Sequence, residues 1–259
     1  MTVHARTTSP TALLRRAIVR ACGLIAMFTL PLAAQAGGWE SVHQSSTWLT
    51  VTVDEAVTKR TALWFDSQWR RMGLGAEPQQ LLLRPGVQWT LTPGARVAGG
   101  YAYIATAPYG EVPSATPLRE HRLWQQLALS HRAGRVSFAH RYRWEQRWLA
   151  PVVGGETQVF QYQQRARYLI RAQTPLGGLT RAGQPVIAFV YDEMLLPVGH
   201  GTATGRLAQN RASVGVGIPL DTRHRIEVGY LNLWNALSTA QTNEFNHTLT
   251  IGLVRTVAR

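Results

Sequence analysis

The chain has 259 residues, and its content of 45% hydrophobic and 9% aromatic residues excludes an intrinsically disordered protein. Its 27 Lys and Arg residues against 14 Asp and Glu residues give a formal net charge of +13, a balance often found in proteins that bind nucleic acid or acidic surfaces. The arginines are spread along alternating segments rather than gathered in one tail or helix, so we expect no nucleic-acid partner.

The first 36 residues have the composition of a signal peptide. Four arginines and no acid accompany the apolar run 21–32, which at about a dozen residues is too short to span a bilayer as a helix. Ala34-Gln35-Ala36 matches the A-x-A cleavage pattern, so we expect ordinary Sec export and a mature protein that begins at Gly37. Cleavage removes the only cysteine, Cys22, and therefore any disulfide. We expect residues 37–46 to form an N-terminal approach segment and residues 47–259 to form one domain.

The clearest structural pattern lies in residues 135–148. One alternating set is mostly apolar and aromatic, from Val136 to Trp148, and the other set is mostly charged. Because successive side chains of a strand point to opposite faces, this period of two predicts a β-strand. The strand is longer than the about five to six residues usual in globular proteins. Long strands with one apolar and one polar face are typical of transmembrane β-barrels, in which lipid contacts the apolar face.

The same alternation predicts strands in ten further segments. These segments are residues 48–53, 62–71, 80–91, 96–106, 120–131, 161–173, 186–196, 209–218, 225–234 and 246–253. The two faces of the segment 186–196 cannot be assigned from its sequence. Short turns such as Thr92-Pro93-Gly94 alternate with longer connections rich in Pro and Gly, which we place at residues 107–117, 149–159, 197–205 and 236–244, and residues 174–184 form a further Gly-rich connection.

These features predict an all-β fold, an antiparallel transmembrane β-barrel of about 10–12 strands, in the outer membrane of a Gram-negative bacterium. A soluble β-sandwich would have shorter strands and no such asymmetry between its connections. Counted back from the C-terminal end, ten strands from Ala62 onward satisfy the even strand number of bacterial barrels. The segment 48–53 makes an eleventh strand. Either residues 37–46 add a twelfth strand, or the segment 48–53 is not part of the barrel.

Several short blocks resemble the domain of unknown function 2490 family. The blocks are EHRLWQQL from Glu120, RYRWEQR from Arg141, LAQNRASVGVG from Leu207, HRIEVGYL from His224 and NEFNHTL from Asn243. The similarity covers most of residues 45–255. It implies a bacterial outer-membrane β-barrel without an established activity, and it supplies no catalytic residues.

Arginine is concentrated on the polar faces of three predicted strands, and acids lie on comparable faces. The candidate lumen-facing residues are Arg141, Arg143, Glu145, Arg147, Arg165, Arg167, Arg171, Arg211, Glu120 and Glu227. In one interpretation these side chains pair with each other and fill a narrow lumen, so that the protein is structural. In the other they attract anions into a narrow channel, since rings of Arg line anion pores. The first interpretation predicts that Arg143 pairs with a carboxylate such as Glu120 or Glu227.

An outer-membrane lipid hydrolase is the alternative function. His43-Gln44-Ser45 places a histidine and a serine on one face of a strand, but no acid partner can be identified and no G-x-S-x-G motif occurs. We therefore predict no catalytic residues, and the protein is expected not to be an enzyme. No cofactor or metal site is predicted. The expected partners are outer-membrane lipids, the barrel-assembly machinery during biogenesis and, in the channel interpretation, small anionic solutes.

Overall fold

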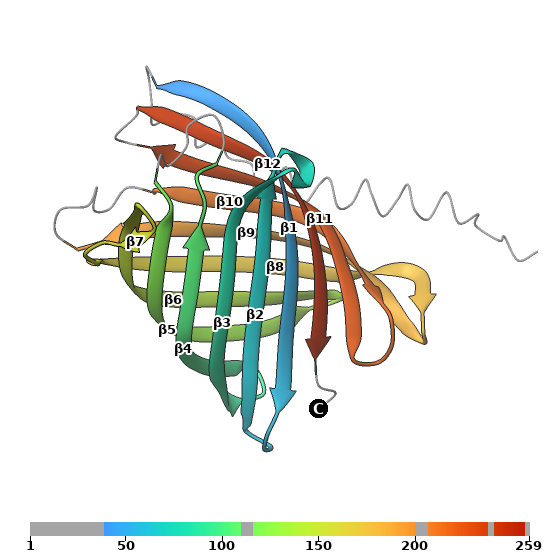
Figure 1. The fold of residues 1–259 in the computed structure, drawn as a ribbon. Coiled ribbons are helices and arrows are strands. Elements are labelled where there is room, and N and C mark those ends of the chain that lie inside the picture. Colours follow the sequence, from blue (N-terminus) through green and yellow to red (C-terminus); the bar gives the residue numbers. More distant parts are fainter. Residues whose placement is uncertain (1–38, 110–115, 200–206, 238–240, 257–259) are drawn as a thin grey trace, which may run out of the picture.

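The computed structural model describes residues 39–109, 116–199, 207–237 and 241–256. The chain forms a closed barrel of eleven long strands, with one additional two-residue strand, β7, beside β6 (Figure 1). The strands are β1 (Glu40–Ala56), β2 (Thr61–Met72), β3 (Glu77–Thr92), β4 (Ala95–Thr106), β5 (Leu118–Ala133), β6 (Val136–Val153), β7 (Glu156–Thr157), β8 (Gln161–Arg181), β9 (Gln184–Val198), β10 (Gln209–Pro219), β11 (His224–Leu237) and β12 (Thr242–Thr256). A short 3-10 turn, η2 (Gly73–Gly75), connects β2 to β3.

The barrel is closed by a parallel pair of strands. The long strands that follow each other along the chain pair in antiparallel fashion, whereas β1 and β12 pair in parallel from Glu40 opposite Thr242 to Asp54 opposite Thr256. With eleven strands the first and the last run in the same direction, so only a parallel pair can join them. Both alternatives for the strand count were therefore wrong: the segment 48–53 belongs to the barrel, and no twelfth long strand precedes it in the described residues.

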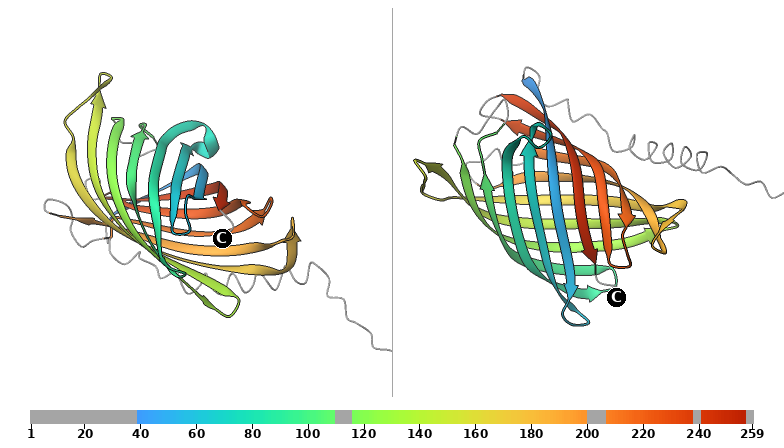
Figure 2. Two further views of the ribbon diagram at one scale, coloured as in Figure 1. Left: turned by 90° about the horizontal axis from the view of Figure 1, so that it is seen from below. Right: turned by 45° about the vertical axis from the view of Figure 1, so that its right-hand side comes forward.

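Three segments expected to lie outside strands are in fact strand. β1 begins at Glu40, so most of the expected approach segment 37–46 belongs to the barrel wall. β6 continues to Val153, and β8 continues to Arg181 to form, with β9, a hairpin that projects beyond its neighbours (Figures 1 and 2). The extensions of β6 and β8 contain Pro or Gly, a composition typical of loops, yet strand pairing continues into both, with a break in register between Pro175 and Thr180 of β8. The expected signal peptide lies outside the described residues.

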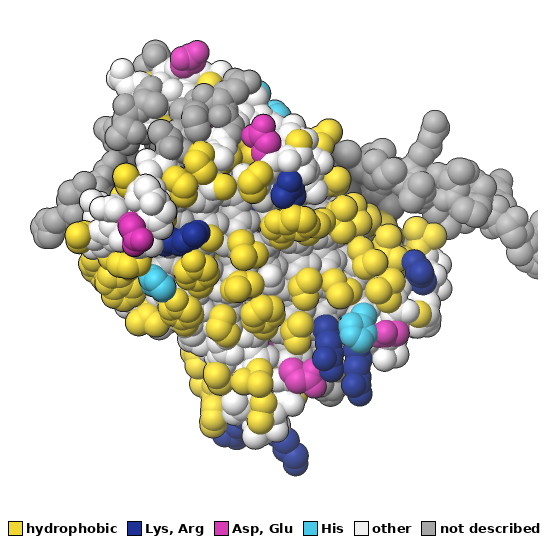
Figure 3. Space-filling model, viewed as in Figure 1, with side chains coloured by type: hydrophobic (Ala, Val, Ile, Leu, Met, Phe, Trp, Pro, Cys, Tyr) yellow, Lys and Arg dark blue, Asp and Glu magenta, His cyan; other side chains and the backbone are white. Residues whose placement is uncertain are grey.

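The two faces of the barrel wall differ in chemistry as the alternation predicts. Large apolar side chains such as Leu63, Trp69 and Ile251 are exposed on the outer face, while polar partners such as Asp66 and Arg70 are buried inside. Figure 3 shows the outer wall covered by hydrophobic side chains, with the charged ones near the strand ends. Among the residues that the structure describes, no helix is long and apolar enough to cross a membrane.

Glycines on the inner face make room for one buried indole. Trp124 is 1% exposed and lies against β3 and β4. A Cβ atom at Gly86 would lie 2.4 Å from the Trp124 ring, and one at Gly100 would lie 2.2 Å from the Pro85 carbonyl oxygen. Any larger residue at these positions would displace the wall or the ring. These glycines thus allow a large aromatic side chain to fill part of the lumen next to the arginines.

The turn between β10 and β11 is closed by one carboxylate. Asp221 Oδ1 accepts the backbone N–H groups of Arg223 at 2.7 Å and His224 at 2.8 Å, and the His224 Nδ1 atom lies 2.8 Å from Oδ2. These hydrogen bonds, with the Arg223 N–H first, lower the pKa of Asp221 to about 2. A lowered carboxyl pKa stabilises the fold above the ordinary Asp pKa of about 3.9, and the stabilisation is lost as the pH falls towards 2.

We therefore expect Asp221→Asn to be less stable than the wild type at neutral pH, with a difference that shrinks between about pH 4 and pH 2. The amide keeps an acceptor oxygen, so the variant removes the charge and not the shape. Urea midpoints measured at several pH values for both proteins would test this. A difference that stays constant across that range would contradict the role of the charge.

Candidate functional site

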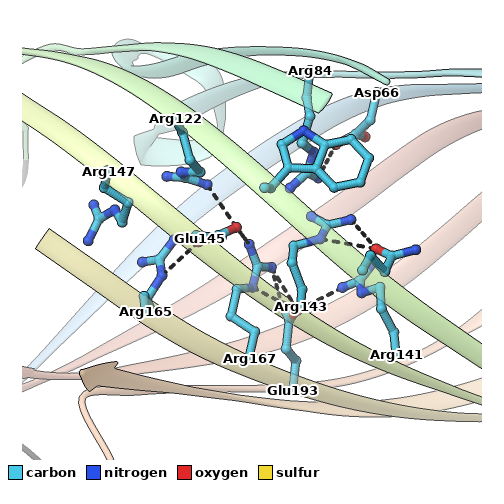
Figure 4. A network of polar contacts seen from close by, with 12 residues as sticks. Asp66, Arg84, Arg122, Arg141, Arg143, Glu145, Arg147, Arg165, Arg167 and Glu193 are labelled. Atoms are coloured by element: carbon cyan, nitrogen blue, oxygen red, sulfur yellow. Dashed lines mark hydrogen bonds and ion pairs between the residues drawn. The ribbon is translucent and has the colours of Figure 1, made fainter. Parts of the chain in front are cut away.

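The centre of the barrel lumen is occupied by a carboxylate that three arginines share. Glu145 on β6 is 0% exposed. Arg165 Nη2 lies 2.6 Å from its Oε2 atom, Arg167 Nη1 lies 2.8 Å from Oε1, and Arg122 Nη1 lies 3.2 Å from Oε1. Figure 4 shows these three guanidinium groups converging on Glu145, Arg122 from β5 and both Arg165 and Arg167 from β8. Charge-assisted bonds of this kind are stronger than neutral ones, so Glu145 cross-links the wall from inside.

Two further carboxylates extend this arrangement. Glu193 accepts from Arg167 at 2.7 Å, from Arg141 at 2.7 Å and from Arg211 at 3.4 Å. Glu120 accepts from Arg147 at 2.7 and 3.0 Å and pairs with Arg122 at 2.7 Å. Because Arg122 and Arg167 each bridge two carboxylates, the whole is one connected set. We call it the lumen network, and it consists of Glu120, Glu145, Glu193, Arg122, Arg141, Arg147, Arg165, Arg167 and Arg211. Six arginines share three carboxylates, so the network carries a net positive charge.

Within the described residues Arg143 does not pair with a carboxylate, contrary to the prediction for a filled lumen. It is 3% exposed, and its Nε and Nη2 atoms donate to Gln126 Oε1 at 3.0 and 2.5 Å. Its guanidinium also lies 4.8 Å from the centre of the Trp124 ring. The prediction was wrong because Glu120 bonds instead to Arg122 and Arg147, while Glu227 bonds to Arg171 at 2.8 Å and to Arg225 at 2.7 Å.

The structure thus brings seven of the ten residues named from sequence, other than Arg143, Arg171 and Glu227, into the lumen network. Arg171 and Glu227 form, with Arg225, a separate cluster close to the start of β11. Five buried residues of the inner face were not among those ten: Arg70, the ion pair of Arg84 with Asp66, Arg122 and Glu193. The first four lie on the polar faces of predicted strands, so a search of every strand rather than the arginine-rich ones would have found them, whereas the faces of the strand that contains Glu193 could not be assigned.

A cavity of about 190 Å³ lies inside the barrel, beside the lumen network and near the ends of β4 and β11. Its walls come from β1, β2, β3, β5, β6, β8, β10 and β11, and from the segment that follows β4. Among the described residues, the lining contains one carboxylate, Glu120, and seven arginines, namely Arg70, Arg84, Arg122, Arg147, Arg165, Arg167 and Arg211. This arrangement is suited to holding a solute with negative charge.

Comparison with known proteins gives a family for the chain. The model of the family described as "Protein of unknown function (DUF2490)" matches residues 45–244. The chain belongs to this family. An uncharacterized protein of Methylorubrum extorquens is 25% identical over 233 residues, which cover 89% of this chain and 95% of that protein. No solved structure matches. The match confirms the resemblance seen in the sequence blocks, and the family description assigns no activity.

The outer wall of this family member carries a second polar arrangement. His43 Nδ1 lies 3.1 Å from His247 Nε2, and His247 Nδ1 lies 2.7 Å from the Tyr230 hydroxyl. Ser45 is opposite His247 in the ladder, yet no hydrogen bond joins it to either histidine in the described part of the chain. A serine nucleophile needs a base within hydrogen-bond reach, so this geometry gives the hydrolase alternative no specific support. The described residues contain no group of three metal-binding side chains.

Proposed function

We propose that this chain is an integral outer-membrane β-barrel protein whose lumen is closed by ion pairs and carries a net positive charge. One observation supports the proposal above all others: the charged side chains are buried inside the barrel, while large apolar side chains cover the outside. A protein in water buries its apolar side chains and leaves most charges exposed. The reversed distribution is stable where lipid contacts the outer wall.

The lumen network favours a closed lumen over an open channel. Glu145 and Glu193 tie together arginines from β5, β6, β8 and β10, so a direct path along the lumen would have to break several buried ion pairs. The excess of arginine over carboxylate nonetheless leaves the lumen attractive to anions. The two interpretations of the arginines are therefore combined in this proposal: the side chains are paired with each other, and the set as a whole remains positive.

Planar-bilayer recording of the purified, refolded protein would test the closed lumen. We expect assembled barrels to show no steady ion current, because the network blocks the lumen. Insertion is established separately by heat-modifiable gel mobility and by protection of the barrel from protease in lipid vesicles. A steady, anion-selective current from the wild type would contradict the closed lumen and favour the channel. Fractionation of the expressing bacterium tests the outer-membrane location.

A further inference from the structure

We propose that the cavity beside the lumen network is a binding site for a small oxyanion of the phosphate or sulfate class, held by Arg70 and Arg211 next to Trp48. This inference rests on the proposed positive lumen and names the solute that the lumen would hold. It also identifies which of the many arginines bind that solute.

Arg70 is a buried cation that forms no ion pair within the described residues. It is 8% exposed and lines the cavity. Its Nη1 atom donates to Gln80 Oε1 at 2.7 Å and its Nε atom to Gln68 Oε1 at 3.2 Å, so its partners are neutral amides. Its guanidinium lies 3.7 Å from the centre of the Trp48 ring. A buried charge is costly without a counter-ion, so an anion in the cavity would relieve that cost.

Arg211 is the second cation at the same place, and its pairing is weak. Its guanidinium lies 5.3 Å from the Trp48 ring, and its contact with Glu193, at 3.4 Å, is longer than the 2.7 Å contacts that Arg141 and Arg167 make with the same carboxylate. The buried Arg211 Nε and Trp48 Nε1 donors have no hydrogen-bond partner among the described residues. Both residues line the cavity.

These donors match the chemistry of a tetrahedral oxyanion. A guanidinium recognises phosphate-type oxygens in a planar, two-bond geometry, and an anion with several oxygens can accept from Arg70 and Arg211 together. Glu120, the only carboxylate in the lining among the described residues, is bonded to Arg122 and Arg147 and does not neutralise this part of the cavity. At about 190 Å³, the cavity far exceeds the about 10–15 Å³ that one water requires.

Isothermal titration of the purified barrel with inorganic phosphate, sulfate and chloride would test the site. We expect the wild type to bind phosphate or sulfate more tightly than chloride, and Arg70→Gln to weaken that binding about tenfold or more, because a charge-assisted bond is lost. Arg143→Gln is the matched control. Arg143 is also buried, is also bonded only to a glutamine and also lies against a tryptophan, but it does not line the cavity. We expect it to bind like the wild type.

A second variant keeps the test decisive if Arg70→Gln assembles poorly. Arg211→Gln leaves Glu193 with two arginine partners, and we expect it to assemble and to lose binding to a similar extent. The proposal is overturned if the wild type binds oxyanions no better than chloride, or if Arg143→Gln weakens binding as much as Arg70→Gln, which would indicate general charge attraction. If the proposed closed membrane barrel is wrong, a different result shows it: the wild type fails to assemble in lipid vesicles, or it gives a steady ion current in the planar-bilayer recording.

Discussion

Replacing Glu145 with Gln should lower the free energy of unfolding by about 3–5 kcal/mol, the range measured when one partner of a buried ion pair is removed. Glu145 is fully buried, and Arg122, Arg165 and Arg167 all donate to it. The amide cannot neutralise the three guanidinium groups that surround this fully buried position. The variant would therefore leave excess positive charge at the centre of the lumen network.

Glu227→Gln is the matched control for this experiment. Glu227 also binds two arginines, but its side chain is 15% exposed and those of Arg171 and Arg225 are 21% and 29% exposed, so water can partly solvate the charges that remain. We expect a clearly smaller loss. Urea unfolding in lipid vesicles, followed by tryptophan fluorescence, would compare both variants with the wild type. Similar losses at the two sites would mean that the lumen network does not depend on Glu145.

A lysine at Ile251 should destabilise the barrel by about 2–4 kcal/mol if the outer wall contacts the middle of a bilayer. Ile251 lies on the outer face of β12, is 38% exposed and stands opposite Val228 and Leu49 of the neighbouring strands. Water would hydrate a lysine at such an exposed position in a soluble protein, and the cost would then be within about 0.5 kcal/mol. Contact with lipid thus predicts a loss of stability that exposure of the same position to water would not cause.

The neighbouring residue provides the control. The side chain of Thr250 lies on the inner face of the barrel, and its hydroxyl donates to the Gly229 carbonyl oxygen at 3.0 Å. We expect Thr250→Lys to cost less than Ile251→Lys, and Ile251→Leu to be close to neutral. The measurement is the folded fraction by heat-modifiable mobility and the unfolding midpoint in vesicles. If Ile251→Lys were as stable as Ile251→Leu, the outer wall would not be in contact with lipid.

The sequence alone determined the strand class and the two faces of most strands. In β6, Tyr142 and Trp144 alternate with Arg143 and Glu145, and this order places aromatic residues outside and charges inside because a strand has a side-chain period of two. The same pattern defined the faces of β2, β3 and β5. It did not define β9, where Tyr191 and Glu193 face inward and Asp192 faces outward, because both faces of that strand mix polar and apolar residues.

Only the tertiary structure decided how the barrel closes and which charges meet. The parallel pairing of β1 with β12 follows from closing an odd number of strands, because the last free edge must form hydrogen bonds whatever its direction. The partners in the lumen network come from strands far apart in the chain: Arg141 reaches Glu193 across 52 positions, and Arg143 faces Gln126 rather than an acid. Alternation shows which way a side chain points. Register and closure decide what it meets there, and those depend on the whole barrel.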